Sequence, residues 1–441
     1  MTATAGKVPE QRSENTFVDY KPAFTDAQAL AEANRCLYCF DAPCTEACPT
    51  SIDVAGFIRK IATGNLKGSA RTIFSSNVFG MTCSRVCPVE TLCAGACVYH
   101  EMEAPPIEIG RLQRHVTDLA YAEGWQFFEA GPDTGKKVVL VGAGPASLAA
   151  AHRLRRYGHQ VTIYEKREVL GGLSTWGIAP HKTRADTALA EVEWVLSIGG
   201  IEVKTGVEVG GPEGPSWEEI QTGADALFVG IGLGSDTTMG VPGEDLPGVE
   251  GAVDFIERMK LGEVDLQGIR HAAVVGGGNT ALDAVRELLT LGVEGVTLLY
   301  RRTEREMPGY VHEWDAAKKE GALALWRAVP VAYEGDPRIE RVRIVAVDEE
   351  RKPIEGTESE VPVDLVLLAI GQQKLAEVPA GLEGVMLDRG KVRVDGRQAT
   401  GRPGVFAGGD CVNGGKEVVN AVDEGQKAAD AIHELLGGNH A

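Results

Sequence analysis

Two stretches of the chain share one order of apolar and polar positions. Each begins with a short apolar run, passes through a glycine-rich turn into an amphipathic segment, and ends on a second apolar run. The first is KVVLVGAGPASLAAAHRLRRYGHQVTIYEK, from residue 137, and the second is HAAVVGGGNTALDAVRELLTLGVEGVTLLYRR, from residue 271. Strand, turn, helix and strand in this order make a βαβ unit, so the pattern predicts two nucleotide-binding domains.

The region before the first stretch has a different pattern, in which apolar positions recur at helical spacing. It predicts helices over residues 26–35, 52–77 and about 109–123. Residues 1–20 are expected to form a loose arm, and the polar stretch 129–137 a linker. We therefore expect residues 1–130 to form a small helical domain.

The glycine turn of the first stretch has the features of a dinucleotide site. Gly142 permits the tight turn, and Gly144 lets the backbone approach a pyrophosphate at the N-terminus of the following helix. Glu165 ends the second strand, where an acid can accept a hydrogen bond from a ribose hydroxyl. Ser147 replaces the usual third glycine, which slightly loosens the contact between helix and strand. The predicted binding residues here are Gly142, Gly144, Pro145, Ala146, Ser147 and Glu165.

Two further segments point to the same cofactor. Gly172 and Leu173 follow Gly171 and would let the chain pass close to an isoalloxazine ring and its pyrophosphate. Near the C-terminus, VFAGGDCV places Gly409 and Asp410 at a strand end, and a helix starts near Val418. Asp410 can hold a ribityl hydroxyl, and the helix N-terminus can face the flavin C2 carbonyl. Distant segments that converge on one long dinucleotide indicate FAD rather than NAD.

The second glycine turn is assigned to a nicotinamide nucleotide. Alanine follows it at the third motif position, which is usual for an inserted domain of this kind. Its second strand ends in two arginines instead of an acid, and these can bind the extra 2′-phosphate of NADP, although a solvated basic turn is the alternative. The predicted residues are Gly276, Gly277, Gly278, Asn279, Thr280, Arg301 and Arg302, with Ala369, Ile370 and Gly371 expected beside the nicotinamide.

These motifs define the expected architecture. It is an α/β protein with an N-terminal all-α domain, followed by two Rossmann-like domains arranged as in glutathione reductase, the second inserted in the first. We expect residues 131–250 and 375–441 to form the FAD-binding domain, and residues 251–374 the NAD(P)-binding domain.

Eight of the nine cysteines lie between positions 36 and 97. Cys36, Cys39, Cys44 and Cys48 have the spacing C-x2-C-x4-C-x3-C-P, and Cys83, Cys87, Cys93 and Cys97 follow. Three close thiolates can hold three irons of a cubane, while a cysteine that precedes proline is turned toward a second cluster. The number suits two [4Fe–4S] clusters, with one ligand supplied from elsewhere.

Two other uses of these cysteines are less favoured. Residues 1–20 contain no apolar export segment, and a chain of 441 residues does not need disulfides to be stable. Zinc sites favour paired C-x2-C sequences, which do not explain Cys48-Pro49 and Cys87-Pro88. The net charge of −19 argues against nucleic acid or an anionic membrane as partner. With no apolar run of about eighteen residues, the chain is expected in the cytoplasm.

Taken together, these residues resemble the glutamate synthase small-subunit family, whose members join a two-cluster domain to a flavin reductase. The phrases that carry the resemblance include CLYCFDAPCTEACPTSIDV, GMTCSRVCPVETLCAGAC, GGLSTWGI and FAGGDCVNGGKEVVNAV. They span nearly the whole chain. Within the family they are most similar to the NAD(P)H-oxidising subunits of bacterial dihydropyrimidine dehydrogenases.

The resemblance implies specific ligands. Cys36, Cys39, Cys44 and Cys97 would hold one cluster, and Cys48, Cys87, Cys93 and Gln113 the other. Gln113 ends the phrase PIEIGRLQ, in which the pyrimidine enzymes use glutamine, and Cys83 is the alternative eighth ligand. The resemblance also implies flavin contacts at Leu173, Lys182 and Val209, with Lys182 near the flavin phosphates. His181 is expected to be incidental, because hydride transfer to flavin needs no protein base.

The function expected from the resemblance is electron input. NAD(P)H would reduce FAD, and single electrons would pass through the two clusters to a partner subunit with FMN and Fe–S clusters that reduces uracil or thymine. No catalytic side chain is expected, since the cofactors carry the chemistry. The alternatives are a subunit of glutamate synthase or of a ferredoxin–NADP reductase, and a non-catalytic redox sensor.

Overall fold

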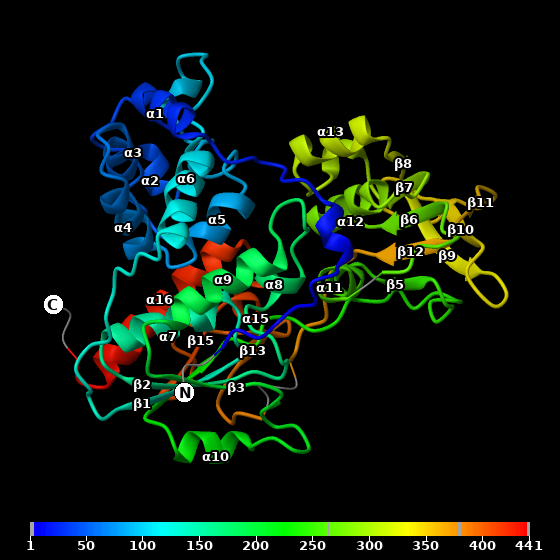
Figure 1. The fold of residues 1–441 in the computed structure, drawn as a ribbon. Coiled ribbons are helices and arrows are strands. Elements are labelled where there is room, and N and C mark those ends of the chain that lie inside the picture. Colours follow the sequence, from blue (N-terminus) through cyan, green and yellow to red (C-terminus); the bar gives the residue numbers. More distant parts are fainter. Residues whose placement is uncertain (1–3, 263, 377–380, 439–441) are drawn as a thin grey trace.

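The structure is a computed structural model that describes residues 4–262, 264–376 and 381–438. It has an N-terminal helical domain and two domains built on five-stranded parallel sheets (Figure 1). The predicted fold class is therefore confirmed.

The helical domain holds six helices around one apolar core. They are α1 (Asp26–Arg35), α2 (Pro43–Glu46), α3 (Val54–Ala62), α4 (Leu66–Ser76), α5 (Gly80–Val86) and α6 (Ile109–Ala122), with a 3-10 turn η2 at Val98–His100. The helix expected over 52–77 is two helices. The break falls at Gly64, which has φ +76°, and the Asn65 side chain caps α4 by accepting from Gly68 N–H.

The N-terminal segment is not the loose arm that the sequence predicted. It runs along the first nucleotide-binding domain to the second, past α8, α9 and α11 (Figure 1). The Ala5 carbonyl accepts from Leu170 N–H at 2.9 Å, and the Glu14 carboxylate, in the 3-10 turn η1 (Ser13–Thr16), accepts from Ala185 N–H at 3.1 Å. Phe17 is buried in the core of the second nucleotide-binding domain. Long-range contacts of this kind carry no local sequence signal.

The first nucleotide-binding domain has the strand order β15-β4-β1-β2-β3. Its strands are β1 (Lys137–Val141), β2 (Gln160–Tyr164), β3 (Ile201–Lys204), β4 (Ala226–Val229) and β15 (Val405–Ala407). Helices α7 (Pro145–Arg156), α8 (Leu173–Trp176), α9 (Ala185–Leu196), α15 (Asp410–Asn413) and α16 (Val418–Leu435) lie on the side of the helical domain, and α10 (Trp217–Thr222) lies on the other. A short hairpin, β13 (Leu387–Asp388) with β14 (Lys391–Val392), precedes β15. Because β15 and α16 come from the C-terminal part, this domain is split.

Helices α7 and α16 approach closely because one of them carries a glycine at the crossing. A Cβ on Gly425 would lie 2.1 Å from the Ala146 carbonyl oxygen. The crossing brings the N-terminus of α16 beside the N-terminus of α7, which follows the first glycine turn.

The second nucleotide-binding domain has the strand order β5-β12-β6-β7-β8. Its strands are β5 (Val249–Gly251), β6 (His271–Val275), β7 (Gly295–Tyr300), β8 (Leu323–Trp326) and β12 (Leu365–Leu368), and an antiparallel sheet of β9 (Ala328–Glu334), β10 (Arg341–Ala346) and β11 (Ser359–Pro362) packs beside them. Its helices are α11 (Ala252–Leu261), α12 (Asn279–Thr290) and α13 (Val311–Glu320), with a 3-10 turn η3 at Glu304–Glu306.

Two segments connect the nucleotide-binding domains, and they run side by side. Thr237 N–H donates to the Gly371 carbonyl, and Gln373 N–H donates to the Ser235 carbonyl, both at 2.8 Å. Since β5 already belongs to the second sheet, the boundary expected at residue 250 lies nearer 235. The error arose because residues 236–248 contain no strand that would show to which sheet they belong.

Candidate functional site

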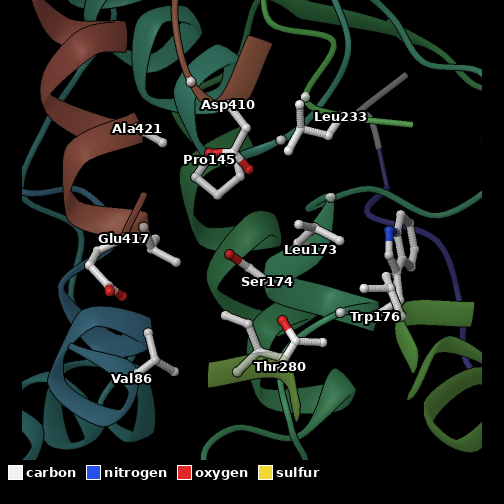
Figure 2. A pocket seen from close by; sticks show the side chains of 18 of the residues that line it. Val86, Pro145, Leu173, Ser174, Trp176, Leu233, Thr280, Asp410, Glu417 and Ala421 are labelled. Carbon is white, nitrogen blue, oxygen red and sulfur yellow. The ribbon is translucent and has the colours of Figure 1, made fainter. Parts of the chain in front are cut away.

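A cavity of about 450 Å³ lies where the three domains meet (Figure 2). Both glycine turns contribute to its wall, as do the start of α16 and the end of α5. The wall is formed by short segments that are far apart in the sequence.

The first glycine turn is shaped by the strands on either side of it. Gly142 has φ +92°, and a Cβ there would lie 2.4 Å from the Gly230 carbonyl oxygen, so only glycine fits. Glu165 lines the cavity from the end of β2. Its Oε2 accepts from Ala143 N–H at 2.7 Å, and its Oε1 accepts from Arg167 N–H at 2.9 Å. The acid therefore holds the turn in place, besides any contact with a ribose.

Ser147 is buried and does not line the cavity. A Cβ on Gly230, at the end of β4, would lie 2.2 Å from the Ser147 hydroxyl oxygen. In the usual motif the third glycine lets the helix pack closely against the strand. Here Ser147 stands at that position, and Gly230 after β4 leaves the room that its side chain needs. The sequence motif alone could not show this exchange.

Gly144 and Gly172 face each other across a narrow part of the wall. A Cβ on Gly172 would lie 3.0 Å from the Gly144 Cα, whereas a Cβ on Gly144 would meet nothing within 4 Å. The neighbouring Ser174 hydroxyl also lines the cavity and has no hydrogen-bond partner among the described residues. Free backbone at a helix N-terminus, open space and an unpartnered hydroxyl fit the pyrophosphate of a dinucleotide.

Asp410 and Val418 line the cavity as predicted, at the starts of α15 and α16. Burial raises the pKa of Asp410 to about 6. Glu424 accepts from Gly409 N–H at 2.6 Å and so fixes the loop that carries Asp410. These groups suit the hydroxyls and the pyrimidine end of a flavin.

The second glycine turn contributes fewer residues to the wall. Asn279 and Thr280 line the cavity, whereas Gly276, Gly277 and Gly278 are not among its lining residues. A Cβ on Gly277 would lie 2.5 Å from the Tyr300 ring, which explains this glycine by packing. Arg301 and Arg302 lie outside the cavity and form no ion pair among the described residues.

The segment expected beside the nicotinamide lies one residue off the cavity. Ala369, Ile370 and Gly371 are not in its wall, but Gln372 is. A Cβ on Gly276 would lie 2.2 Å from the Ala369 carbonyl oxygen, so this segment supports the glycine turn from behind.

Lys182 faces the second nucleotide-binding domain rather than the first glycine turn. Its Nζ lies 2.8 Å from Asp283 Oδ1 and 2.7 Å from Glu313 Oε1. Burial alone would lower the pKa of Lys182, but these two carboxylates raise it above its ordinary value. The expected contact with flavin phosphates would require the ammonium to leave both acids.

Lys182 itself lines the cavity, whereas Val209 and His181 do not. Val209 is buried in the core beneath the first sheet. His181 is also buried, and burial lowers its pKa to about 3, so the ring is neutral near pH 7. The ring lies 3.6 Å from Asp283, and its expected incidental role stays a prediction.

The first predicted cysteine set comes together. One small cavity in the helical domain is lined by Cys36, Cys39, Cys44 and Cys97. Burial raises the pKa of Cys44 to about 11, and the nearby thiols of Cys36 and Cys97 contribute to this rise. Four thiols gathered in one small, partly buried cavity fit the ligand set of an iron cluster, whose cationic irons would hold them as thiolates.

The second set is also gathered. The pKa of Cys87 is raised by a hydrogen bond with Cys83, by burial, and by the nearby thiols of Cys93 and Cys48. Gln113 is buried, and its amide nitrogen donates to the Gly80 carbonyl at 2.7 Å. Both candidates for the eighth ligand therefore lie at α5, Cys83 within it and Gln113 against its first residue.

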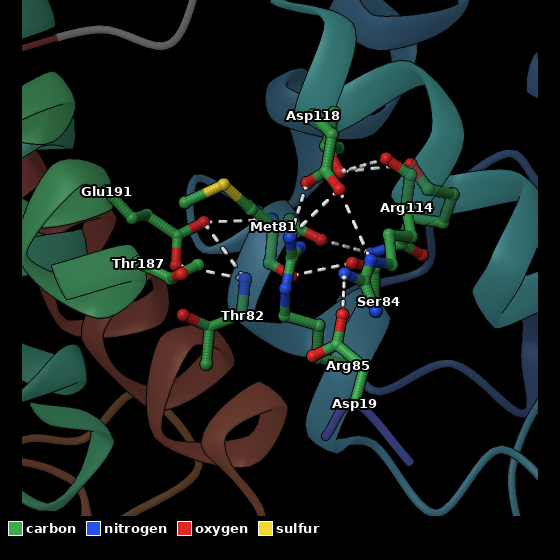
Figure 3. Close-up of polar contacts among 12 residues, drawn as sticks. Asp19, Met81, Thr82, Ser84, Arg85, Arg114, Asp118, Thr187 and Glu191 are labelled. Atoms are coloured by element: carbon green, nitrogen blue, oxygen red, sulfur yellow. Dashed lines mark hydrogen bonds and ion pairs between the residues drawn. The ribbon is translucent and has the colours of Figure 1, made fainter. Parts of the chain in front are cut away.

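The two sites are connected by α5. Arg85, Val86, Cys87 and Pro88 all line the large cavity, so Cys87, a predicted ligand of the second set, lies in the same wall as the glycine turns. Glu191 on α9 fixes the other end of this helix, since its carboxylate accepts from Met81 N–H at 2.8 Å and from Thr82 N–H at 3.0 Å (Figure 3).

Sequence reasoning missed Glu191 altogether. It lies in an ordinary helical pattern, and only the folded chain brings it to α5. Burial raises its pKa to about 7. On the far side of α5, Asp118 accepts from Arg85 and Arg114, and Arg114 also pairs with Asp19 at 2.7 Å (Figure 3).

Comparison with known families agrees with this arrangement. Residues 12–125 match the family described as dihydropyrimidine dehydrogenase domain II, 4Fe-4S cluster, and residues 136–425 match pyridine nucleotide-disulphide oxidoreductases. The chain belongs to this oxidoreductase family. It is an FAD-dependent NAD(P)H oxidoreductase with a 4Fe–4S domain, and the resemblance to glutamate synthase small subunits is confirmed.

Two relatives match over almost their whole length. The chain is 37% identical to PreT, an NAD-dependent dihydropyrimidine dehydrogenase subunit of Escherichia coli K12, over 96% of this chain and 98% of the relative. It is 34% identical to the glutamate synthase [NADPH] small chain of Halomonas elongata, over 98% of this chain and 95% of the relative.

Solved structures show the same fold for the two nucleotide-binding domains. Mycobacterium tuberculosis FprA superposes with a TM-score of 0.59 at 20% identity, covering 70% of this chain and 85% of FprA. Thioredoxin reductase of T. acidophilum gives 0.53 at 23% identity, covering 68% and 98%. Among the described residues, no helix has the length and apolar character needed to cross a bilayer.

Proposed function

We propose that this chain is the electron-input subunit of a dihydropyrimidine dehydrogenase, which oxidises NAD(P)H and passes electrons to a partner subunit. When bound, FAD would supply two-electron oxidation of the nucleotide, and two [4Fe–4S] clusters would supply one-electron transfer. The observation that carries the proposal is the shared wall of the large cavity, which joins both glycine turns to Cys87-Pro88.

The residues of this wall would divide the work between binding and exclusion of water. Gly142, Gly144 and Gly172 would cradle the FAD pyrophosphate, and Asp410 would hold the ribityl chain. Asn279 and Thr280 would bind the nicotinamide nucleotide at the N-terminus of α12. Val86 and Leu173 are apolar parts of the same wall, and they would keep water away from the reacting atoms.

The cysteines would hold the clusters through which electrons leave the cavity. Cys48, Cys87 and Cys93, with Gln113 or Cys83, would hold the cluster next to the cavity. Cys36, Cys39, Cys44 and Cys97 would hold the second, farther from it. The partner we expect carries FMN and Fe–S clusters and reduces uracil or thymine to the 5,6-dihydropyrimidine. PreT and the glutamate synthase small chain, by their names, are themselves parts of larger enzymes.

The test uses the chain purified without oxygen. It should contain about eight irons and one FAD, and NAD(P)H should bleach its flavin and drive reduction of ferricyanide. It should not reduce uracil or thymine until a partner subunit that contains FMN and Fe–S clusters is added. Reduction of uracil by the isolated chain would contradict the proposal, as would a preparation that holds zinc in place of iron.

Glutamate synthase is the second candidate, because its small chains match over the same length. It predicts that the partner forms glutamate from glutamine and 2-oxoglutarate and is inactive with pyrimidines. Assaying one reconstituted complex with both substrate pairs separates the two functions.

A further inference from the structure

One tyrosine joins the two nucleotide-binding domains across the cavity. Tyr310, just before α13 in the second domain, donates its hydroxyl hydrogen to Glu417 Oε1 in the first domain at 2.7 Å. Both side chains line the cavity, and Glu417 lies at its edge near Val86 in Figure 2. The bond therefore crosses between the domains at the site itself.

The backbone of the same residue is tied to the second glycine turn. Tyr310 N–H donates to Asn279 Oδ1 at 3.1 Å, and Gly309 N–H donates to the Gly277 carbonyl at 2.9 Å. Tyr310 is thus fixed at one end to the turn that would bind a nucleotide. At its other end it is fixed to the first residues of α16, which we expect to face the flavin.

Glu417 is used in an unusual way. It occupies the position before α16 at which a side chain commonly caps a helix, but it makes no capping bond. Its carboxylate is directed across the domain boundary instead. Glu313, in the first turn of α13, adds a second bond across the boundary through Lys182. Residues 309–313 therefore link the glycine turn to the first domain at two points.

The tyrosine is also held in orientation. Its ring stacks on His312, with ring centroids 5.8 Å apart and planes at 15°. Burial, followed by the hydrogen bond to Glu417 and then the charge of Glu417, raises the pKa of Tyr310, while hydrogen bonds to Asn279 and Thr91 lower it. The hydroxyl consequently stays protonated, and remains a donor, across the neutral pH range.

We propose that Tyr310 is a positioning residue that holds the nucleotide turn at a fixed distance from the N-terminus of α16. A nicotinamide bound at Asn279 and Thr280 must reach a flavin bound at Gly144 and α16, and that separation is the length that Tyr310 spans. Hydride transfer depends on this distance, since small displacements of reacting atoms cost large factors in rate. The inference rests on the proposed function, because it assumes that both cofactors share this cavity.

The test is Tyr310→Phe, which keeps the ring and removes only the hydroxyl. Rapid mixing with NADH or NADPH, followed at the flavin absorbance, gives a dissociation constant and a limiting rate of bleaching. We expect the limiting rate to fall about tenfold, with the dissociation constant changed less than about threefold. Hydrogen–deuterium exchange without nucleotide should increase in peptides that cover residues 305–314 and 414–421.

Three further variants make the result specific. Glu417→Ala should act like Tyr310→Phe, and the double variant should be no slower than either, because both remove one bond. Glu417→Gln should lose less, since an amide oxygen still accepts. Tyr333→Phe is the matched control, because that hydroxyl lies in the second domain away from the cavity and should leave rate and exchange unchanged.

Two outcomes would overturn the inference. An unchanged limiting rate with unchanged exchange would show that the bond positions nothing. A faster rate would show that Tyr310 obstructs the nicotinamide instead of positioning it. Wild-type protein that does not bleach at all with either nucleotide would instead refute the proposed function, so the two failures are distinguishable.

Discussion

The two βαβ units have nearly the same backbone but different surroundings. Gly144 and Gly278 both precede a helix, with φ −77° and −88° and ψ 178° in each, and a Cβ on either would meet nothing within 4 Å. The first turn is enclosed by Gly172 and α16, and the end of α5 shares its cavity. The second is covered mainly by residues 309–313.

Under the proposed function, this difference separates a resident cofactor from a passing substrate. An enclosed turn suits a flavin that stays bound through many turnovers. A turn with one covering segment suits a nucleotide that must enter and leave. The same motif can therefore serve either purpose, and its neighbours decide which.

The largest expected effect comes from the residue that shapes the enclosed turn. Gly142→Ala should destabilise the first domain by about 3 kcal/mol, because φ is +92° and the new Cβ would lie 2.4 Å from a carbonyl oxygen. Chemical denaturation and FAD content measure this. A Gly142→Ala protein with normal stability and a full complement of FAD would show that the turn is not constrained as described.

The paired variants Gly144→Ala and Gly278→Ala test the comparison directly. Neither Cβ meets protein atoms, so both proteins should fold with nearly unchanged stability. Gly144→Ala should lose FAD. Gly278→Ala should keep FAD and bind NAD(P)H about tenfold more weakly, or about 1.4 kcal/mol. The measurements are flavin content and nucleotide titration, and the reverse pattern would mean that the two assignments are exchanged.

A smaller effect is expected from Arg301 and Arg302, which follow β7, on the choice between NADPH and NADH. Arg301→Ala with Arg302→Ala should raise the KM for NADPH about tenfold and leave the KM for NADH unchanged, if these guanidiniums bind a 2′-phosphate. Steady-state ferricyanide reduction with each nucleotide gives the ratio. Equal values in wild type and variant would indicate that the arginines form only a solvated turn.

The smallest effect concerns Glu191, whose carboxylate joins α9 of the first nucleotide-binding domain to α5 of the helical domain. The folded-state pKa of Glu191 is about 7, above its ordinary value of 4.5, so the folded protein retains a proton that the unfolded chain has released. Its contribution to stability therefore falls as pH rises from about 4.5 to 7 and is constant above that range. Glu191→Gln should remove this slope, changing the Tm difference between pH 5 and pH 8 by about 2 °C or more. Parallel pH profiles for the two proteins would contradict the assignment.

Much of the fold could be predicted from local patterns. Strand and helix periodicity located both βαβ units, and cysteine spacing identified the helical domain as a cluster domain. The four cysteines grouped by resemblance, among them Cys97, which lies far along the chain from the others, do line one cavity. The strands, the helices and the first cysteine run are visible because residues near in sequence determine them, whereas the grouping of Cys97 came from the resemblance.

The rest depends on contacts between distant residues. Gly230 replaces the small residue that the motif lacks at Ser147, Asp283 and Glu313 determine where Lys182 points, and Glu417 meets Tyr310 more than a hundred residues away. No local pattern marks such pairs. The boundary near 235 was missed for a related reason, since pairing with β12 is what assigns β5 to its sheet.

The burial of Phe17 in the core of the second nucleotide-binding domain has a consequence for biosynthesis. During synthesis Phe17 emerges from the ribosome long before Phe255, Leu282 and Leu367 are made, and these residues belong to the same core. The helical domain lies between them in sequence and can acquire its metal while the leading segment is still unanchored. Maturation of this chain should therefore end, rather than begin, with its first twenty residues.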